Sequence, residues 1–170
     1  GAILFNVALV SDTHVNEKED FSASPYPANG EANPRARYVF QQINKGSTQF
    51  CIHLGDMVNP VPELPSYIHA ADNFHKLAAE LTIPLHLMPG NHDIGDKPVT
   101  WMPAGMVNNE HISLYRKHFG SDYFSFNHEN CHFVIINSPL INSGDPAEKE
   151  QTDWLEADLE SNAEKRIFLF

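Results

Sequence analysis

Three polar clusters follow three apolar runs of the chain, each at the point where the run ends. They are Asp12-Thr13-His14, Gly55-Asp56 with Asn59, and Gly90-Asn91-His92-Asp93. Their side chains offer carboxylate oxygen, imidazole nitrogen and amide oxygen. This mixed donor set suits manganese, iron or zinc better than calcium, whose ligands are all oxygen. Each cluster alone is weak evidence of function, because short motifs recur by chance. The order and placement of all three together predict a divalent-metal site.

The elements that must position these clusters are buried β-strands. Residues 3–10, 50–54 and 83–88 are almost continuously apolar, which is typical of strands covered on both faces. Helical patterns separate them, one beginning at an Asn33-Pro34 cap and another capped by Ser66. Alternation of strand and helix predicts an α/β sheet with crossover connections. Ligands bind outside the carboxyl ends of such strands, so the three clusters should converge.

The second half of the chain has a different pattern. Residues 121–127 and 131–137 flank a polar turn at 128–130, which predicts an antiparallel hairpin. A helix should follow Asp145-Pro146, and the apolar residues 167–170 indicate another buried strand. A chain rarely ends inside a core strand. We therefore expect residues 1–170 to form a single domain that is incomplete at its C-terminus.

Composition narrows the possible partners. The net charge is −11, which disfavours sustained binding to a polynucleotide or an acidic membrane, because such binding needs a basic surface. Cys51 and Cys131 lie in apolar stretches and are predicted to be reduced core cysteines. No run is long and apolar enough to span a membrane. A cytoplasmic location is favoured, and removal of a signal peptide would instead make the protein secreted or periplasmic.

The three clusters resemble the first three motifs of the calcineurin-like metallophosphoesterases. The run SDYFSF, the apolar stretch ending in Asn137-Ser138, and the pattern Gln151-x-x-Trp154-Leu155 resemble the second half of the same family. The likeness covers nearly the whole chain and is strongest to single-domain members. It implies an α/β fold of two packed mixed β-sheets flanked by helices, the metallophosphoesterase sandwich, with the C-terminal part missing.

The resemblance also implies a dinuclear centre with two divalent or trivalent ions of Mn, Fe or Zn. Asp12 and His14 would bind the first metal, Asp56 would bridge, and Asn91 would bind the second. His92 would face the substrate and protonate the leaving oxygen. The family's remaining histidine ligands, one after the fourth strand and two in a Gly-His-x-His motif, do not occur before Phe170. We therefore expect residues 1–170 alone to be a weak or inactive catalyst.

Four further residues are candidates for supporting roles. Asn59 stands where many relatives have Asp, so the help that it gives to His92 should be an uncharged hydrogen bond. Asp93 could orient His92 instead, or serve only in the turn. Lys97 and Trp101 lie in the long loop 95–109 and, with Met102, could contact a leaving group. Ordinary loop packing explains these loop residues equally well, and loop 21–33 is a second candidate for specificity.

These features favour a metal-dependent hydrolase that uses a metal-activated water. Its substrate would be a phosphomonoester or a small phosphodiester, carried by a small molecule or a phosphoprotein. A non-catalytic binding scaffold with the same fold is the alternative, and His92 argues against it because binding needs no proton donor. A metal-dependent nuclease is disfavoured by the acidic charge. The substrate, the metals and the oligomeric state stay open.

Overall fold

Two β-sheets form the centre of the computed structural model, which describes residues 4–99, 101 and 103–170. The first contains β1 (Val7–Val10), β2 (Phe50–His53) and β3 (Leu85–Leu87), all parallel and in that order. The second contains β4 (Phe124–His128), β5 (Cys131–Ile135) and β6 (Arg166–Leu169), in that order. In it, β5 is antiparallel to β4 and parallel to β6.

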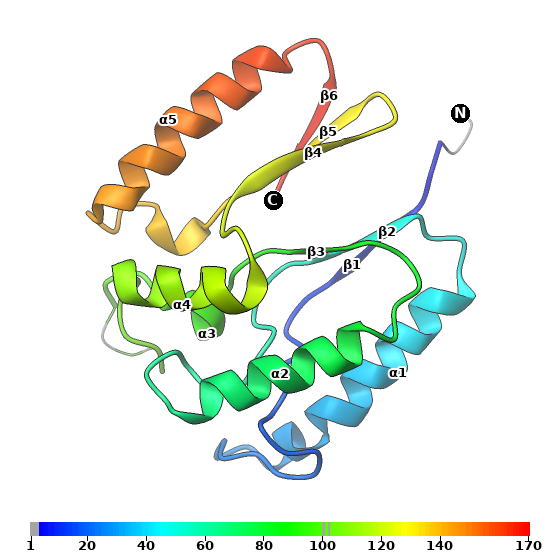
Figure 1. Cartoon of the computed structure of the whole chain (residues 1–170), viewed down its shortest axis with the longest axis vertical. Coiled ribbons are helices and arrows are strands. Elements are labelled where there is room, and N and C mark those ends of the chain that lie inside the picture. The colour runs from blue at the N-terminus through cyan, green and yellow to red at the C-terminus, as the bar shows by residue number, and fades with distance from the viewer. Residues whose placement is uncertain (1–3, 100, 102) are drawn as a thin grey trace.

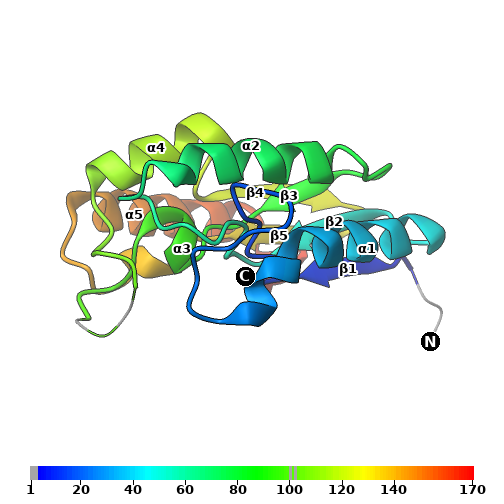
Figure 2. The same ribbon diagram turned by 90° about the horizontal axis from the view of Figure 1, so that it is seen from below.

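Helices cover the outer face of each sheet. In Figure 1, α1 and α2 lie on one side of the first sheet, the second sheet lies on its other side, and α5 lies beyond the second sheet. Figure 2 shows α1 and α2 spread over their face of the molecule. The helices are α1 (Ala32–Lys45), α2 (Ser66–Ala78), α3 (Asn91–Ile94), α4 (Asn109–Phe119) and α5 (Pro146–Ser161), with 3-10 turns η1 (Pro27–Glu31) and η2 (Ser138–Leu140). The predicted α/β fold of two packed sheets flanked by helices is confirmed, and the first sheet is parallel throughout these strands.

Two apolar cores hold these layers together. One lies between the sheets, where Phe50 and Ile52 of β2 pack with Phe133 and Ile135 of β5. Aromatic rings dominate this contact, and Phe50 and Phe133 meet edge to face at 5.1 Å between centroids. The other core joins the first sheet's loops to the helices, and Phe40 of α1 is fully buried there with residues of α2 and α4. The site described below lies on a framework packed from both sides.

The apolar runs overestimate the burial of two outer strands, β1 and β6, and the length of β1. The first predicted strand starts at residue 3, which lies outside the described residues, whereas β1 begins at Val7. Leu9 is 53% exposed and Leu169 of β6 is 52% exposed. Both strands lie at a sheet edge among the described residues. The predictions that β1 is covered on both faces and that β6 is a buried strand are therefore wrong, because hydrophobicity does not distinguish an edge strand from a central one.

The helix caps were predicted with mixed success. Asp145 caps α5 as expected, accepting a hydrogen bond from the Ala147 N–H at 2.9 Å. Ser66 is not a cap, since α2 begins at this residue and its side chain makes no capping bond. Asn33 lies inside α1, where its side-chain oxygen accepts from the Asn16 N–H at 2.7 Å. Tertiary contacts, rather than local capping, decide the conformation of Asn33.

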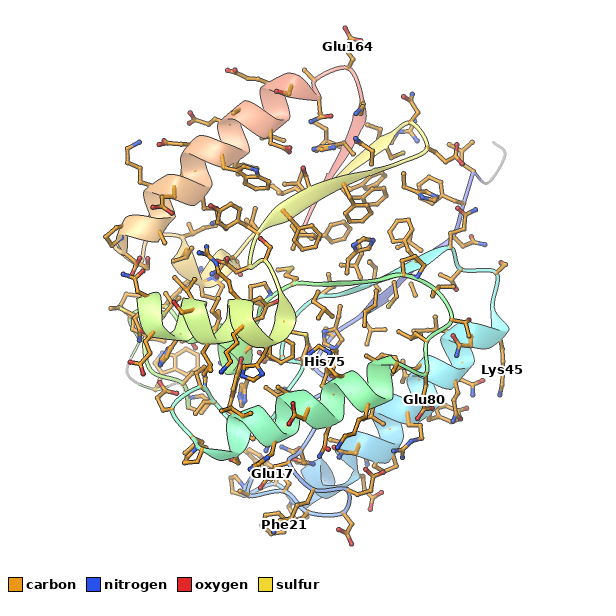
Figure 3. The ribbon with its side chains drawn as sticks, viewed as in Figure 1. Glu17, Phe21, Lys45, His75, Glu80 and Glu164 are labelled. Atoms are coloured by element: carbon orange, nitrogen blue, oxygen red, sulfur yellow. The ribbon has the colours of Figure 1, made fainter. Side chains whose placement is uncertain are left out.

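The surface carries most of the charged side chains. In Figure 3, Glu164 projects at the top of the view, beyond α5, and Lys45 projects at the right edge, at the end of α1. Cys51 and Cys131 are buried and free, as predicted. Within the described ranges, none of the helices combines the length and the apolar character needed to cross a membrane.

Candidate metal centre

The register of the first sheet brings the three polar clusters together. Val10, the last residue of β1, pairs with His53 of β2, and His53 pairs with Leu87 of β3. The three strands therefore end at the same level of the sheet and at the same edge. Asp12 follows two residues after β1 and Asp56 three residues after β2. The predicted convergence follows directly from parallel strands in this register.

Two glycines allow the second and third clusters to approach closely. A Cβ atom on Gly55 would lie 2.7 Å from the Gly90 nitrogen, and one on Gly90 would lie 2.2 Å from Asp56 Oδ1. Gly55 also has a φ of +105°, in the left-handed region that favours glycine. The contact between the ends of β2 and β3 thus leaves no room for side chains at these positions. It places the Asp56 carboxylate against the start of α3.

The backbone of the first two clusters is held in an unusual conformation. Asp12, His14 and Asp56 have φ values of +56°, +42° and +56°, although they are not glycines. Hydrogen bonds hold the two segments side by side, from Asp12 N–H to the Gly55 carbonyl and from His14 N–H to the Asp56 carbonyl, both at 3.0 Å. Left-handed non-glycine residues are costly and concentrate at functional sites.

The side chains of these clusters converge at spacings typical of metal ligands. His14 Nε2 lies 3.6 Å from Asp12 Oδ1 and 3.7 Å from Asp56 Oδ2. Ligand bonds of about 2.0–2.2 Å place two ligands of one ion at most about 4.4 Å apart. Potential ligand atoms of His14, Asp56 and His92 all lie within 4.8 Å of one another. These three residues are therefore a candidate group for holding a cation.

The protonation of His14 also fits a bound metal. Burial, followed by the nearby His92, lowers the pKa of His14, while Asp56 and Asp12 act in the opposite direction. Neutral imidazole is the form that binds metal. The donors present at this edge therefore match the chemistry of the expected ions.

Two hydrogen bonds hold His92, one through its ring and one through its own backbone N–H. Its Nδ1–H donates to the Asn59 carbonyl oxygen at 2.6 Å, and its backbone N–H donates to Asp56 Oδ1 at 3.0 Å. The ring meets that of His14 edge-on, with centroids 4.7 Å apart. Because Nδ1 carries the donated proton, Nε2 is the nitrogen available for other chemistry.

Asn59 supports His92 through its main chain rather than its side chain. The hydrogen bond to His92 is uncharged, as expected, but its acceptor is the Asn59 main-chain carbonyl. The side-chain amide of Asn59 donates to Ser22 Oγ at 3.1 Å. Asn29 also reaches the Asn59 side chain, at 3.5 Å, and it lies in η1, within the segment 21–33 that was predicted to be a loop. The Asn59 side chain therefore ties this loop to the site. Such a contact could not be predicted from the residue type, because every residue has a main-chain carbonyl.

Asp93 stabilises the turn and does not contact the His92 side chain. It is fully buried, and its carboxylate accepts hydrogen bonds from the backbone N–H groups of Met57, Val58 and Gly90 at 2.9, 3.3 and 2.9 Å. Burial and the charge of Asp56 raise the pKa of Asp93 to about 8, while the N–H donors oppose this shift. Asp93 thus fixes the end of β2 against the start of α3.

His53 and Thr13 form a second support beneath the site that the motif analysis did not assign. Thr13 Oγ1 donates to the Met57 carbonyl at 3.0 Å and contacts His53 Nε2 at 2.9 Å, while His53 Nδ1 accepts from the Gly55 N–H at 3.3 Å. His53 must therefore be neutral to satisfy both contacts. Burial, followed by the charge of His14, lowers the pKa of His53 to about 4, although Asp12 opposes the shift.

This histidine should make the stability of the metal-free protein depend on pH. The neutral form is required in the fold, whereas unfolded histidine titrates near 6.5. Stability from His53 is therefore present above pH 6.5 and lost as the pH falls towards 4. Between pH 7.5 and 5.0, we expect the contribution of His53 to the free energy of unfolding to fall by about 2 kcal/mol. Urea titration with a chelator present measures this contribution as the difference between the wild-type protein and a variant without His53, because the raised pKa of Asp93 acts in the opposite direction in both proteins.

The matched variants are His53→Gln and His69→Gln, since His69 lies exposed on α2. Replacement of His53 should lower stability at pH 7.5 and remove this part of the pH dependence, while replacement of His69 should leave the dependence unchanged. An equal pH dependence in both variants would show that His53 does not titrate in this way.

A cleft of about 350 Å³ opens beside the converged clusters. Asp12, Asp56, Asn91 and Lys97 are among its lining residues. Trp101 is not one of them and is 80% exposed, so the structure does not bring it to the site. Met102 lies outside the described residues. The cleft also contains residues to which the sequence assigned no role: Asp96, Ser138 and Pro139.

The second sheet reaches the cleft through the residues that follow β5. Gln151 of α5 accepts from the Asn137 N–H at 2.7 Å and donates to the Asn137 carbonyl at 3.2 Å. The Asn137 side chain donates to the buried Asp122 at 3.0 Å. These contacts fix the segment that places Ser138 and Pro139 in the cleft wall. Asn137 and Gln151 therefore have a structural role in this chain, which is to hold the segment after β5 in place.

A known protein family accounts for nearly the whole chain. A sequence profile described as "Calcineurin-like phosphoesterase" matches residues 5–169. The chain therefore belongs to the calcineurin-like phosphoesterase family.

Individual relatives carry a protein phosphatase name. The chain is 30% identical over 131 residues to the serine/threonine-protein phosphatase CPPED1 of Bos taurus, a match that covers 73% of this chain and 39% of the bovine protein. The human CPPED1 is 29% identical over 126 residues, covering 70% of this chain and 37% of that protein. The chain thus matches less than half the length of these relatives.

Solved structures share the fold at low sequence identity. A dimetal phosphatase from Danio rerio matches with a TM-score of 0.67 and 14% identity, over 98% of this chain and 69% of that chain. A purple acid phosphatase from yellow lupin matches with a TM-score of 0.56 and 18% identity, over 91% of this chain and 27% of that chain. At these identities, the likeness extends to the fold alone.

Proposed function

We propose that the protein is a metal-dependent hydrolase of phosphate esters with a dinuclear centre. The observation that carries this proposal is the convergence of His14, Asp56 and His92 at the carboxyl edge of the first sheet. Asp12 and His14 would hold one ion, Asn91 the other, and Asp56 would bridge them. Mn, Fe or Zn fits these mixed donors. When bound, such ions attract phosphoryl oxygens and lower the pKa of water.

The residues of the chain supply orientation and a proton. The Asn59 carbonyl fixes the His92 ring through Nδ1, which leaves Nε2 directed to other partners. A protonated Nε2 can donate to the departing alkoxide, a step that typically contributes about 10²–10⁴-fold to the rate. Asp93 and His53 hold the surrounding turns in place through backbone contacts. The site is thus pre-arranged before substrate enters.

Two substrate classes fit the cleft. A small phosphorylated molecule fits a cleft of about 350 Å³, and the protein phosphatase name of the CPPED1 relatives favours phosphoserine or phosphothreonine in a protein. Lys97, in the cleft wall, would attract the negatively charged ester. A cytoplasmic location accords with the two free cysteines.

Removal of metal tests the function directly. The full-length protein treated with a chelator should lose at least about 100-fold of its rate on nitrophenyl phosphate, since the ions contribute several kcal/mol to the reaction. Added Mn²⁺ should restore the rate. Hydrolysis that survives complete chelation would rule out a metal-dependent mechanism, and absence of hydrolysis with any of the three metals would favour the binding scaffold.

Replacement of His92 tests its role as proton donor. His92→Ala should lower kcat by about 10²–10⁴-fold for an alkyl phosphate. The loss should be smaller for nitrophenyl phosphate, because nitrophenolate leaves without a proton. The number of bound metal ions, measured by elemental analysis, should not change. Loss of one ion in this variant would instead identify His92 as a ligand.

A further inference from the structure

One wall of the cleft contains groups that the proposed metal centre does not use. Asp96 and Lys97 follow α3, and Ser138 follows β5, so two separate parts of the chain meet there. They lie in the same cleft as Asp12, Asp56 and Asn91. An ester bound at the metal centre must direct its alcohol portion into the space beside it. This wall is therefore positioned to contact the leaving group.

Asp96 offers a buried acceptor that nothing in the described part of the chain satisfies. The side chain is only 9% exposed. Its Oδ1 accepts from the Lys97 N–H at 2.7 Å, whereas Oδ2 is buried and has no hydrogen-bond partner. A buried polar group without a hydrogen bond is unfavourable, and more so when it is charged. A hydrogen-bond donor on a ligand would recover this energy.

The backbone around Asp96 is held in place from several directions. Its N–H donates to the Gly105 carbonyl at 2.8 Å, and its carbonyl accepts from the Val107 N–H at 2.8 Å. The Gly105 N–H in turn donates to Glu63 at 2.8 Å. These bonds fix Asp96 before any ligand arrives. A pre-arranged acceptor binds with less loss of entropy than a mobile one.

Lys97 and Ser138 complete the polar wall. Lys97 is the one basic residue in the lining of this cleft among the described residues, and it forms no ion pair there. Its ammonium group can balance the charge of Asp96 and attract an anionic ester, while Ser138 adds a hydroxyl group. Asp96 is the acceptor that distinguishes this wall from a merely cationic one.

We propose that Asp96, with Lys97 and Ser138, forms a leaving-group subsite for alcohols that carry a hydrogen-bond donor close to the ester. The donor can be a hydroxyl, an ammonium or a peptide N–H group. This proposal rests on the proposed phosphoesterase function and specifies its substrate class. It makes Asp96 a binding residue that determines specificity.

The test compares esters that differ in this donor. The metal-loaded full-length protein should hydrolyse glycerol 1-phosphate with a kcat/KM about 10–100-fold above that for propyl phosphate, as expected for a hydrogen bond to a charged group. Phosphoethanolamine and a phosphoserine peptide distinguish ammonium and amide donors from hydroxyl. The subsite is supported if at least one donor class shows the preference and contradicted if none does.

Asp96→Asn is the decisive variant. Its oxygen can still accept from the Lys97 N–H, but an amide nitrogen, which is a donor, replaces the free oxygen. The preference for donor-bearing esters should disappear, because kcat/KM should fall much more for these esters than for propyl phosphate, while the bound metal content stays unchanged. The control Asp72→Asn, an exposed carboxylate on α2, should keep the preference. Equal losses on both esters, or loss of an ion, in Asp96→Asn would overturn the proposal.

Binding measurements separate this proposal from the proposed function. If the wild-type protein hydrolyses none of the esters, the phosphoesterase function fails. Calorimetric titration of the same metal-loaded protein with glycerol 1-phosphate and propyl phosphate still tests the subsite. Tighter binding of the first, lost in Asp96→Asn, would support the subsite, and equal binding of both would overturn it.

Discussion

Asp56→Asn should abolish most of the activity while leaving the protein folded. Asp56 Oδ2 lies 3.7 Å from His14 Nε2, and Oδ1 accepts the His92 N–H at 3.0 Å. The side chain is only 15% exposed. An asparagine oxygen can keep the contact with His92, but a neutral amide cannot bridge two cations as a carboxylate does. We expect kcat to fall by about 10³-fold or more, since the ions contribute several kcal/mol.

Metal analysis of the same variant shows the cause of the loss. The number of bound ions per chain should fall from two to one or none, and the thermal midpoint of the metal-free protein should change little. Asp20→Asn serves as the control, because Asp20 is exposed in the loop before α1. Two ions retained in Asp56→Asn with an unchanged rate would refute the bridging role.

Gly90→Ala should damage both stability and the site. The φ of Gly90 is −102°, which any residue can adopt, so the requirement for glycine is one of space alone. The added Cβ would lie 2.2 Å from Asp56 Oδ1 and 2.4 Å from the Asp56 nitrogen. Overpacking of this kind typically costs about 1–3 kcal/mol, and a backbone atom as the obstacle places the expected loss near the upper end.

The control for this variant is Gly30→Ala. A Cβ at Gly30 meets nothing within 4 Å, so its effect on the free energy of unfolding, measured by urea titration, should stay within about 1 kcal/mol. Gly90→Ala should also bind metal more weakly, because Asp56 must move away from His14. Equal stability of the two variants would mean that the ends of β2 and β3 are not as closely packed as described.

The convergence of the three polar clusters could be predicted from the sequence because it follows from two simple patterns. Apolar runs indicated parallel strands, and polar clusters followed each run. The register that pairs Val10, His53 and Leu87 then brings the clusters to one edge. Convergence needs no knowledge of individual side-chain contacts. The edge position of β1, and hence the exposure of Leu9, depends on which strands are neighbours and could not be read from the run itself.

The supporting contacts could not be predicted because they use main-chain atoms. Asn59 orients His92 through its carbonyl, and Asp93 binds backbone N–H groups rather than His92. Residue type says little about either contact. The burial of Asp96 depends on how the 95–109 loop folds back, with Gly105 and Val107 beside it. Trp101 in the same loop is exposed, although its size and type suggested a contact.

Anomalous diffraction from crystals of the full-length protein grown with Mn²⁺ tests the central claim most directly. We predict two peaks about 3.5–4 Å apart, one beside Asp12 and His14 and one beside Asn91, with Asp56 between them. A single ion, or ions bound away from these residues, would contradict the dinuclear centre.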